Sequence, residues 1–276
     1  MKRLMTLLLI AFIFPSLASA QEKDKKNNHP TLIVEVIRGS GNQGSYFYPP
    51  GQDIRKVDVL SISADTRNSN DSSGWIISGG AKLISKTGKE FDISARGQFL
   101  SVGPVHLDFG MSYFYSNAHS DLFASDSLDL NGQTQKHSGF LSAGGGIGSY
   151  KQSHARISFI AGGLYIKNSL YIHSNNELSN PYNNLFGEDV LVVKGGELIL
   201  SLRLFNRLVV ESTKRYIRTG LNKQGMIPDE QILISGKVNF FIYRNFGISI
   251  KGSYGSDPLG PHLLARSIEA GLALKF

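Results

Sequence analysis

The chain has 276 residues, no cysteine and a formal net charge of +7 at pH 7. The lack of cysteine excludes a fold held together by disulfide bonds, and it excludes a lipoprotein anchor, which needs a cysteine at the processing site. The 30 Gly, 11 Tyr and 16 Phe favour a fold built of many strands. The charge run at Glu22–Lys26 lacks the clustered basic face of a nucleic-acid-binding protein, so we expect no nucleic-acid partner.

Residues 1–20 have the pattern of a cleaved secretory signal peptide. Its parts are a basic start, an apolar run and a small-residue cleavage signal, at Lys2 and Arg3, Leu4–Phe14 and Ala18–Ala20. The apolar run is shorter than the about 20 residues that a membrane-spanning helix requires. We therefore expect an exported chain whose net charge falls from +7 to +5 on cleavage. A polar tail at 21–30 would precede a single domain at 31–276.

The rest of the chain alternates between apolar and polar residues with a period of two, as a strand with one apolar face does. The clearest case is Pro104–Tyr115, where Val105, Leu107 and Phe109 alternate with His106 and Asp108. Twelve such segments can be recognised, at 31–38, 57–65, 74–85, 89–99, 104–115, 138–150, 154–167, 196–205, 206–217, 231–243, 245–255 and 265–276.

The connections between these segments alternate in length. Short turns at 100–103, 151–153, 204–207 and 243–245 separate long polar stretches at 116–137, 168–188, 218–230 and 255–264. Short turns at one end and long loops at the other are typical of outer-membrane barrels, whose long loops are extracellular. Two junctions fit less well, because the inner turn at 65–73 is long and the outer turn at 85–88 is short. A barrel of ten strands with 31–38 outside the wall is therefore an alternative to twelve.

The last segment places Ile268, Ala270, Leu272, Leu274 and Phe276 on one face. It resembles the closing strand of Gram-negative outer-membrane β-barrel proteins, in which the terminal aromatic residue belongs to the signal read by the barrel-assembly machinery. The resemblance implies an all-β, antiparallel, transmembrane up-and-down barrel of about 12 strands in the outer membrane. Leu272, Leu274 and Phe276 would form the assembly signal. Expected partners are the assembly machinery, periplasmic chaperones, and the lipid and lipopolysaccharide around the wall.

If the apolar face contacts lipid, the opposite face lines the lumen. The charged residues expected there are Asp92, Arg96, His106, Asp108, Arg156, Glu197, Arg203, Glu211, Arg215, Lys237, Lys251 and Glu269. Basic residues outnumber acidic ones in this set, which favours a small, porin-like diffusion channel for anionic solutes. In the alternative, the charges pair across a narrow lumen and seal it. The protein would then be a structural or surface-binding barrel, such as an adhesin or receptor, and its loops at 116–137 and 168–188 would make the contacts.

An outer-membrane hydrolase is a third and weaker hypothesis. His106, Asp108 and Ser112 share one face of a strand. Along an extended strand, however, His106 and Ser112 are about 20 Å apart, too far to act together. We therefore predict no catalytic residue, and no cofactor. The loop residues His119, Asp121, Asp126 and Asp129 indicate a solvated loop or a loose divalent-cation site, without the spacing of a calcium loop. The glycine run at 144–148 lacks phosphate-loop spacing and indicates bending or close packing of a strand.

Overall fold

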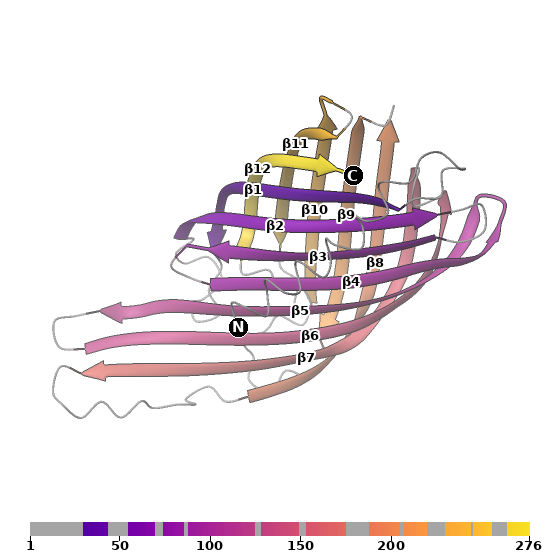
Figure 1. The fold of residues 1–276 in the computed structure, drawn as a ribbon. Coiled ribbons are helices and arrows are strands. Elements are labelled where there is room, and N and C mark those ends of the chain that lie inside the picture. The colour runs from indigo at the N-terminus through magenta and orange to yellow at the C-terminus, as the bar shows by residue number, and fades with distance from the viewer. Residues whose placement is uncertain are drawn as a thin grey trace.

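The structure is a computed structural model that describes residues 30–43, 55–69, 74–85, 88–124, 128–148, 153–174, 188–204, 207–219, 230–243, 245–255 and 264–276. These residues form twelve strands (Figure 1): β1 (Thr31–Gln43), β2 (Arg55–Ser69), β3 (Gly74–Ile84), β4 (Gly88–Val102), β5 (Val105–Ala124), β6 (Leu128–Gly148), β7 (His154–Ser174), β8 (Glu188–Leu204), β9 (Leu208–Thr219), β10 (Glu230–Phe241), β11 (Phe246–Gly255) and β12 (Leu264–Lys275). The expected signal peptide lies outside the described residues.

Each strand pairs antiparallel with its neighbour in sequence, and β1 pairs with β12, so the sheet closes into a barrel. The seam continues to the last residue. The Leu32 N–H donates to the Phe276 carbonyl at 3.1 Å, and the Phe276 N–H donates to the Leu32 carbonyl at 2.8 Å. A closed sheet pairs its backbone groups internally, which a lipid environment requires. The twelve-stranded prediction is confirmed, and the ten-stranded alternative is wrong because β1 lies in the wall.

The barrel has two unlike ends. We call the end with connections 70–73, 103–104, 149–153, 205–207 and 242–245 the short-turn end, and the end with connections 44–54, 85–87, 125–127, 175–187, 220–229 and 256–263 the long-loop end. The alternation predicted from the sequence is thus present over most of the barrel. Two connections at the long-loop end, 85–87 and 125–127, are exceptions because they are short.

Strands β5, β6 and β7 continue past the wall at the long-loop end (Figure 1). Strand β4 pairs with β5 only as far as Ala118, and β8 pairs with β7 only as far as Lys167. Beyond those points the three strands pair with one another alone. We call this three-stranded sheet the β5–β7 extension; it consists of residues 119–124, 128–134 and 168–174.

The β5–β7 extension corrects two predictions. The loop expected at 116–137 is wrong, since only 125–127 connect β5 and β6, and the loop expected at 168–188 begins too early, since β7 reaches Ser174. These strand ends continue beyond the last pairs with β4 and β8, and a sheet that leaves the membrane needs no apolar face. The period-two signal therefore disappears although the backbone pairing continues.

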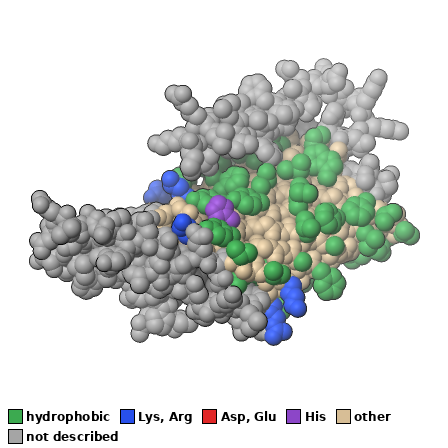
Figure 2. All heavy atoms as spheres, turned by 90° about the horizontal axis from the view of Figure 1, so that it is seen from below, with side chains coloured by type: hydrophobic (Ala, Val, Ile, Leu, Met, Phe, Trp, Pro, Cys, Tyr) green, Lys and Arg blue, Asp and Glu red, His purple; other side chains and the backbone are tan. Residues whose placement is uncertain are grey.

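The outer face of the barrel is apolar, as the alternation predicted. On β8, the side chains of Leu198, Leu200, Leu202 and Leu204 are 37–46% exposed. Figure 2 shows one side of the molecule on which hydrophobic side chains predominate and no acidic side chain is visible. The predicted assembly residues Leu272, Leu274 and Phe276 also point outward, with exposures of 50%, 39% and 50%. Within the described residues, no helix has the length and hydropathy needed to span a bilayer.

The glycine run near the end of β6 serves close packing. A Cβ built on Gly144 would lie 2.1 Å from the Ile157 carbonyl oxygen, and one on Gly146 would lie 2.5 Å from that of Ala155. Gly148 has a φ of +94°, a backbone conformation that L side chains rarely adopt. The expectation of close packing at this run is confirmed.

The interior is layered along the barrel axis. Strand β9 shows the order from the short-turn end: Val209, then Glu211 and Arg215, then Ile217. Near the short-turn end, a buried apolar cluster joins four strands through Ile33, Val209, Phe241 and Ala273. A larger apolar cluster lines β6–β9 toward the long-loop end and consists of Phe140, Ile160, Leu164, Ile166, Leu191, Val193 and Ile217. Between them lies a band of charged residues that includes Glu35, Glu197, Glu211, Arg215 and Lys237.

Candidate functional site

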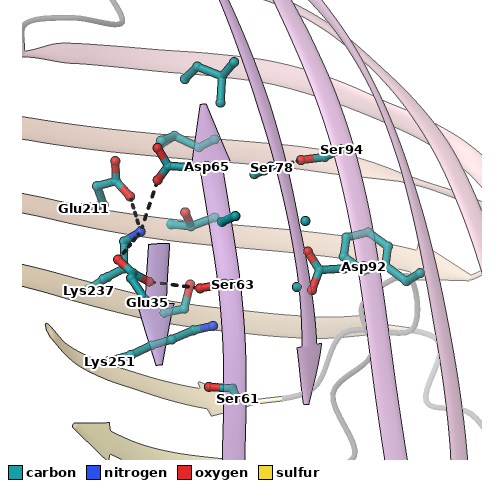
Figure 3. A pocket seen from close by; sticks show the side chains of 18 of the residues that line it. Glu35, Ser61, Ser63, Asp65, Ser78, Asp92, Ser94, Glu211, Lys237 and Lys251 are labelled. Carbon is teal, nitrogen blue, oxygen red and sulfur yellow. Dashed lines mark hydrogen bonds and ion pairs between the residues drawn. The ribbon is translucent and has the colours of Figure 1, made fainter. Parts of the chain in front are cut away.

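The charged band contains two clusters, and Lys237 is the centre of the first. Its Nζ lies 3.1 Å from Glu35 Oε1, 3.3 Å from Glu211 Oε2 and 3.6 Å from Asp65 Oδ2. Figure 3 shows the ammonium group between these three carboxylates, which come from β1, β9 and β2. One cation therefore holds three acidic groups from three strands. We call this set, together with Arg67, the Lys237 cluster.

Arg67 connects opposite sides of the barrel. Its Nη2 lies 2.7 Å from Asp65 Oδ2 on its own strand, and its Nη1 lies 3.0 Å from Glu211 Oε1 on β9. Strands β2 and β9 are separated around the wall by β1, β12, β11 and β10 in one direction and by β3–β8 in the other. The Arg67–Glu211 ion pair therefore crosses the lumen directly.

The second cluster is centred on a carboxylate. Glu197 Oε1 lies 2.9 Å from Arg96 Nη2, and Glu197 Oε2 lies 2.6 Å from Arg215 Nη2. Arg96 is on β4 and Glu197 is on β8, so this pair also spans non-adjacent strands. The Arg215 guanidinium lies 5.0 Å from the centroid of the Phe140 ring, a cation–π distance. We call these residues the Glu197 cluster.

Two smaller contacts extend the network. Lys82 Nζ lies 2.9 Å from Glu269 Oε1, and the Ser61 hydroxyl donates to Glu269 Oε2 at 2.8 Å. Nearer the short-turn end, Arg156 Nε lies 2.9 Å from Asp108 Oδ2. His106 Nε2 is 3.9 Å from the same oxygen, so Arg156 is the closer partner of Asp108.

A chamber of about 330 Å³ remains among these residues. Two of the charged residues that line it, Asp92 and Lys251, make no ion pair within the described part of the chain. Small hydroxyl side chains fill much of the remaining wall, including Ser78 and Ser94, whose oxygens are 2.7 Å apart (Figure 3). The chamber can therefore accommodate a small polar molecule.

The sequence-predicted lumen residues lie at several depths. Those that line the chamber are Asp92, Arg96, Arg156, Glu197, Glu211, Arg215, Lys237 and Lys251. His106, Asp108 and Glu269 are almost fully buried outside it. Arg203 lies nearer the short-turn end, where its backbone N–H donates to the Ser153 hydroxyl at 3.0 Å.

Sequence reasoning missed several members of the network. Glu35 shares its inward face with Ile33 and Ile37, so the alternation of that segment gave no reason to expect a polar lumen side. The predicted segment at 57–65 has Asp65 as its final residue, so Arg67 lies beyond its predicted end. Lys82 lies in the predicted segment at 74–85, where the alternation is weak. Assigning alternate residues of β3 to the inner face would have identified it.

No metal site is evident in the described ranges, where no group of three His, Cys, Asp or Glu side chains could hold an ion. The candidate cation ligands His119, Asp121, Asp126 and Asp129 have side chains outside the described part or in the strand ends whose side chains are not described. That hypothesis therefore stays a prediction.

Solved structures share this architecture at low sequence identity. The translocator domain of the autotransporter NalP from Neisseria meningitidis has a TM-score of 0.50 and 12% identity, covering 99% of this chain and 95% of that chain. The β domain of the Bordetella autotransporter BrkA has a TM-score of 0.43 and 12% identity, covering 90% and 98%. No protein-family model and no curated protein sequence matches the chain. The chain has the fold of Gram-negative outer-membrane β-barrel proteins.

Proposed function

We propose that the protein is a closed outer-membrane barrel that presents the β5–β7 extension as a binding surface outside the cell. The observation that carries this proposal is the crossing of the lumen by direct ion pairs, above all Arg67–Glu211 and Arg96–Glu197. In a diffusion channel the charges of the lumen are hydrated and separated by water. Here they neutralise one another at contact distance.

An open pathway through this band would require the ion pairs to separate. Glu197 is fully buried as a side chain, and Arg67 is only 3% exposed. Breaking a buried pair by removing one partner costs about 3–5 kcal/mol. The apolar cluster of Ile33, Val209 and Phe241 adds a second obstruction at the short-turn end, on the side of β1, β9 and β10.

The proposed outward orientation follows from the general rule that long loops of outer-membrane barrels are extracellular. The β5–β7 extension would then stand above the membrane surface on one side of the barrel. A sheet of this kind offers more rigid contact area than a loop of equal length, because its backbone is fixed by pairing on both β5–β6 and β6–β7.

Planar-bilayer recordings of the refolded protein test the closed lumen. Heat-modifiable migration in SDS gels first establishes that the barrel has folded. We expect no stepwise conductance in concentrated KCl from the wild type. Stable, frequent steps of a single size would overturn the proposal of a closed barrel.

Cysteine labelling in intact cells tests the outward extension, since the chain has no cysteine of its own. Gln133→Cys places a thiol on the β5–β7 extension, and Val102→Cys places one beside a turn at the opposite end, at an exposed position. We expect a membrane-impermeant maleimide to label the first in intact cells and the second only after the outer membrane is opened. The reverse labelling pattern would show that the barrel has the opposite orientation in the membrane and would overturn the proposed outward extension.

A second candidate function is a narrow passage or binding chamber for a small polar solute. The chamber favours it, because Asp92 and Lys251 both line the chamber and could meet the two charges of a zwitterion such as an amino acid. Solute uptake into proteoliposomes would test it. Uptake that Asp92→Asn and Lys251→Met both abolish would favour this candidate over the closed barrel, and equal leakage of wild type and variants would reject it.

A further inference from the structure

The lipid-facing wall has a hollow of about 430 Å³ across β10, β11, β12 and β1. Six of the residues that line it lie on the outward face by strand alternation: Ser40, Ile234, Gly236, Gly252, Tyr254 and Ile268. The others are Gly41, Ser253 and Ser267. Gly236 pairs directly with Gly252, and Ile268 pairs with both Gly252 and Ser40. A continuous row across four strands therefore carries two glycines, an isoleucine and a serine on the outward face. We call this hollow the wall groove.

The sheet itself does not require glycine at two of the positions that line the wall groove. A Cβ on Gly236 would meet nothing nearer than the Glu211 carbonyl oxygen at 3.8 Å, and one on Gly252 nothing nearer than that of Ser267 at 3.6 Å. By contrast, a Cβ on Gly271 would lie 2.1 Å from the Val36 carbonyl oxygen, so that glycine is required for packing. Gly236 and Gly252 leave space on the outside of the barrel without serving the backbone.

Two cations border the wall groove. Lys214 pairs in register with Ile234, and Arg38 precedes Ser40 by two residues on the same face of β1. Both side chains are exposed, and within the described residues neither forms an ion pair. An outward Lys or Arg on a barrel costs up to about 2–4 kcal/mol at the bilayer midplane, so an anionic partner in the lipid would stabilise these positions.

The charge around the groove is predominantly positive. Lys194 and Arg218 pair directly across β8 and β9, on the long-loop side of Lys214. The carboxyl-bearing residues that adjoin these positions are Asp58, which pairs with Ser40, and Glu230, which pairs with Arg218. Like charges in register destabilise a sheet, and Glu230, in register with Arg218, is the one acidic residue beside the Lys194–Arg218 pair in the described strands.

We propose that the wall groove binds an acyl chain of a phosphorylated glycolipid of the lipid A type, with Lys214 and Arg38 contacting its phosphate groups. The groove lies at the centre and in the long-loop half of its strands, which faces the outer leaflet in the orientation proposed above. The apolar chain of such a ligand would occupy the space above the two glycines. Its phosphate groups would pair with the neighbouring cations. The glycolipid of the outer leaflet has both an apolar chain and phosphate groups.

A second copy of the chain fits the groove less well. Such an interface would bury Arg38 and Lys214 against an outer wall whose described carboxylate near the groove is Asp58. Burial of cations without partners is strongly unfavourable. The lipid supplies the missing anions, whereas another barrel wall supplies mainly apolar side chains.

The experiment measures lipid retention by native mass spectrometry of the refolded full-length barrel, with added bisphosphorylated lipid A, dephosphorylated lipid A or phosphatidylethanolamine. The test variants are Gly236→Leu with Gly252→Leu, which fill the groove, and Lys214→Gln with Arg38→Gln, which remove its charge. The matched controls are Gly163→Leu, an outward glycine on β7 whose Cβ would meet nothing within 4 Å, and Lys89→Gln on β4. Gel mobility before and after heating verifies the fold of each variant.

We expect the wild type and both controls to retain bisphosphorylated lipid A. Retention should fall at least about tenfold, equivalent to 1.4 kcal/mol, in each test variant. Dephosphorylated lipid A should bind the wild type as weakly as it binds the charge variant. Equal retention by wild type and test variants, or a preference for phosphatidylethanolamine, would overturn the proposal. Dimers of the wild type that the groove-filling variant alone abolishes would overturn it as well. The labelling experiment on Gln133→Cys reports orientation separately.

Discussion

The Lys237 cluster and the Glu197 cluster use opposite arrangements of charge within one barrel. In the first, a single ammonium group contacts three carboxylates, and Arg67 supplies the other cation. In the second, a single carboxylate contacts two guanidinium groups. The two clusters have opposite formal net charge, and Glu211 and Arg215 place one member of each on the same strand, β9.

In the proposed closed barrel, this difference explains how a lumen with many charges would stay closed. In the Glu197 cluster, loss of the one carboxylate leaves two guanidinium groups together. In the Lys237 cluster, Arg67 still pairs with Asp65 and Glu211 when Lys237 is lost. The sequence suggested a basic lumen from charged inward residues on eight of the strands. The structure adds Glu35 and Asp65, which make the two clusters complementary rather than uniformly basic.

The largest expected effect is that of Glu197→Gln. The change leaves Arg96 and Arg215 without their carboxylate in a site where Glu197 has no exposed side-chain surface. We expect a loss of about 3–5 kcal/mol of unfolding free energy. Urea titration of the refolded barrel in lipid vesicles measures it. Asp58→Asn on the outer wall is the control, and an equal effect of the two changes would contradict the role of the Glu197 cluster.

Lys237→Met should have the next largest effect, toward the lower end of the same range, about 3 kcal/mol. Arg67 still pairs with Asp65 and Glu211 in this variant, and the Lys237 side chain is 19% exposed, so part of its charge is already hydrated. The same urea titration measures the change. A loss greater than that of Glu197→Gln would reverse the ranking of the two clusters.

The Arg67–Glu211 contact should show a coupling energy of about 1–3 kcal/mol in a double-mutant cycle. Arg67→Gln, Glu211→Gln and the double variant are compared with the wild type by unfolding free energy. The coupling arises because the 3.0 Å pair joins β2 and β9 across the lumen. Additive effects of the two substitutions would show that the side chains do not interact across the barrel.

The smallest expected effect concerns the aromatic support of the Glu197 cluster. Phe140→Leu removes the ring beneath Arg215 while keeping an apolar side chain of similar size. A loss of about 1 kcal/mol is expected from the cation–π contact and imperfect packing. The comparison is Phe241→Leu, in the other apolar cluster, where the Phe241 ring centroid lies 5.6 Å from Lys275 Nζ rather than beside Arg215. When Arg215 is already Met, the loss caused by the Phe140 change should shrink to its packing part, whereas the loss caused by the Phe241 change should be unaltered.

Period-two alternation predicted the strands wherever one face meets lipid. Leu198 to Leu204 illustrates this, since every second residue is a leucine on the outer wall. The same rule failed at 119–134, because strands outside the membrane need no apolar face. It also underestimated β1, whose inward Ile33 and Ile37 obscure the parity of Glu35.

The pairing of the lumen charges could not be read from the sequence. Glu211 and Arg67 are far apart in the chain, and their contact depends on how the barrel closes and how its strands are staggered. Parity alone places both side chains inside. It cannot decide whether water or another side chain occupies the space between them.

The most direct test of the proposed closed, two-cluster lumen is the reversal potential of Glu197→Gln and Lys237→Met barrels in planar bilayers under a KCl gradient. The wild type, measured beside them, is expected to be silent. Loss of Glu197 leaves excess positive charge, so its residual conductance should prefer chloride. Loss of Lys237 leaves excess negative charge, so its conductance should prefer potassium. Reversal potentials of the same sign in both variants, or wild-type conductance equal to theirs, would contradict the account.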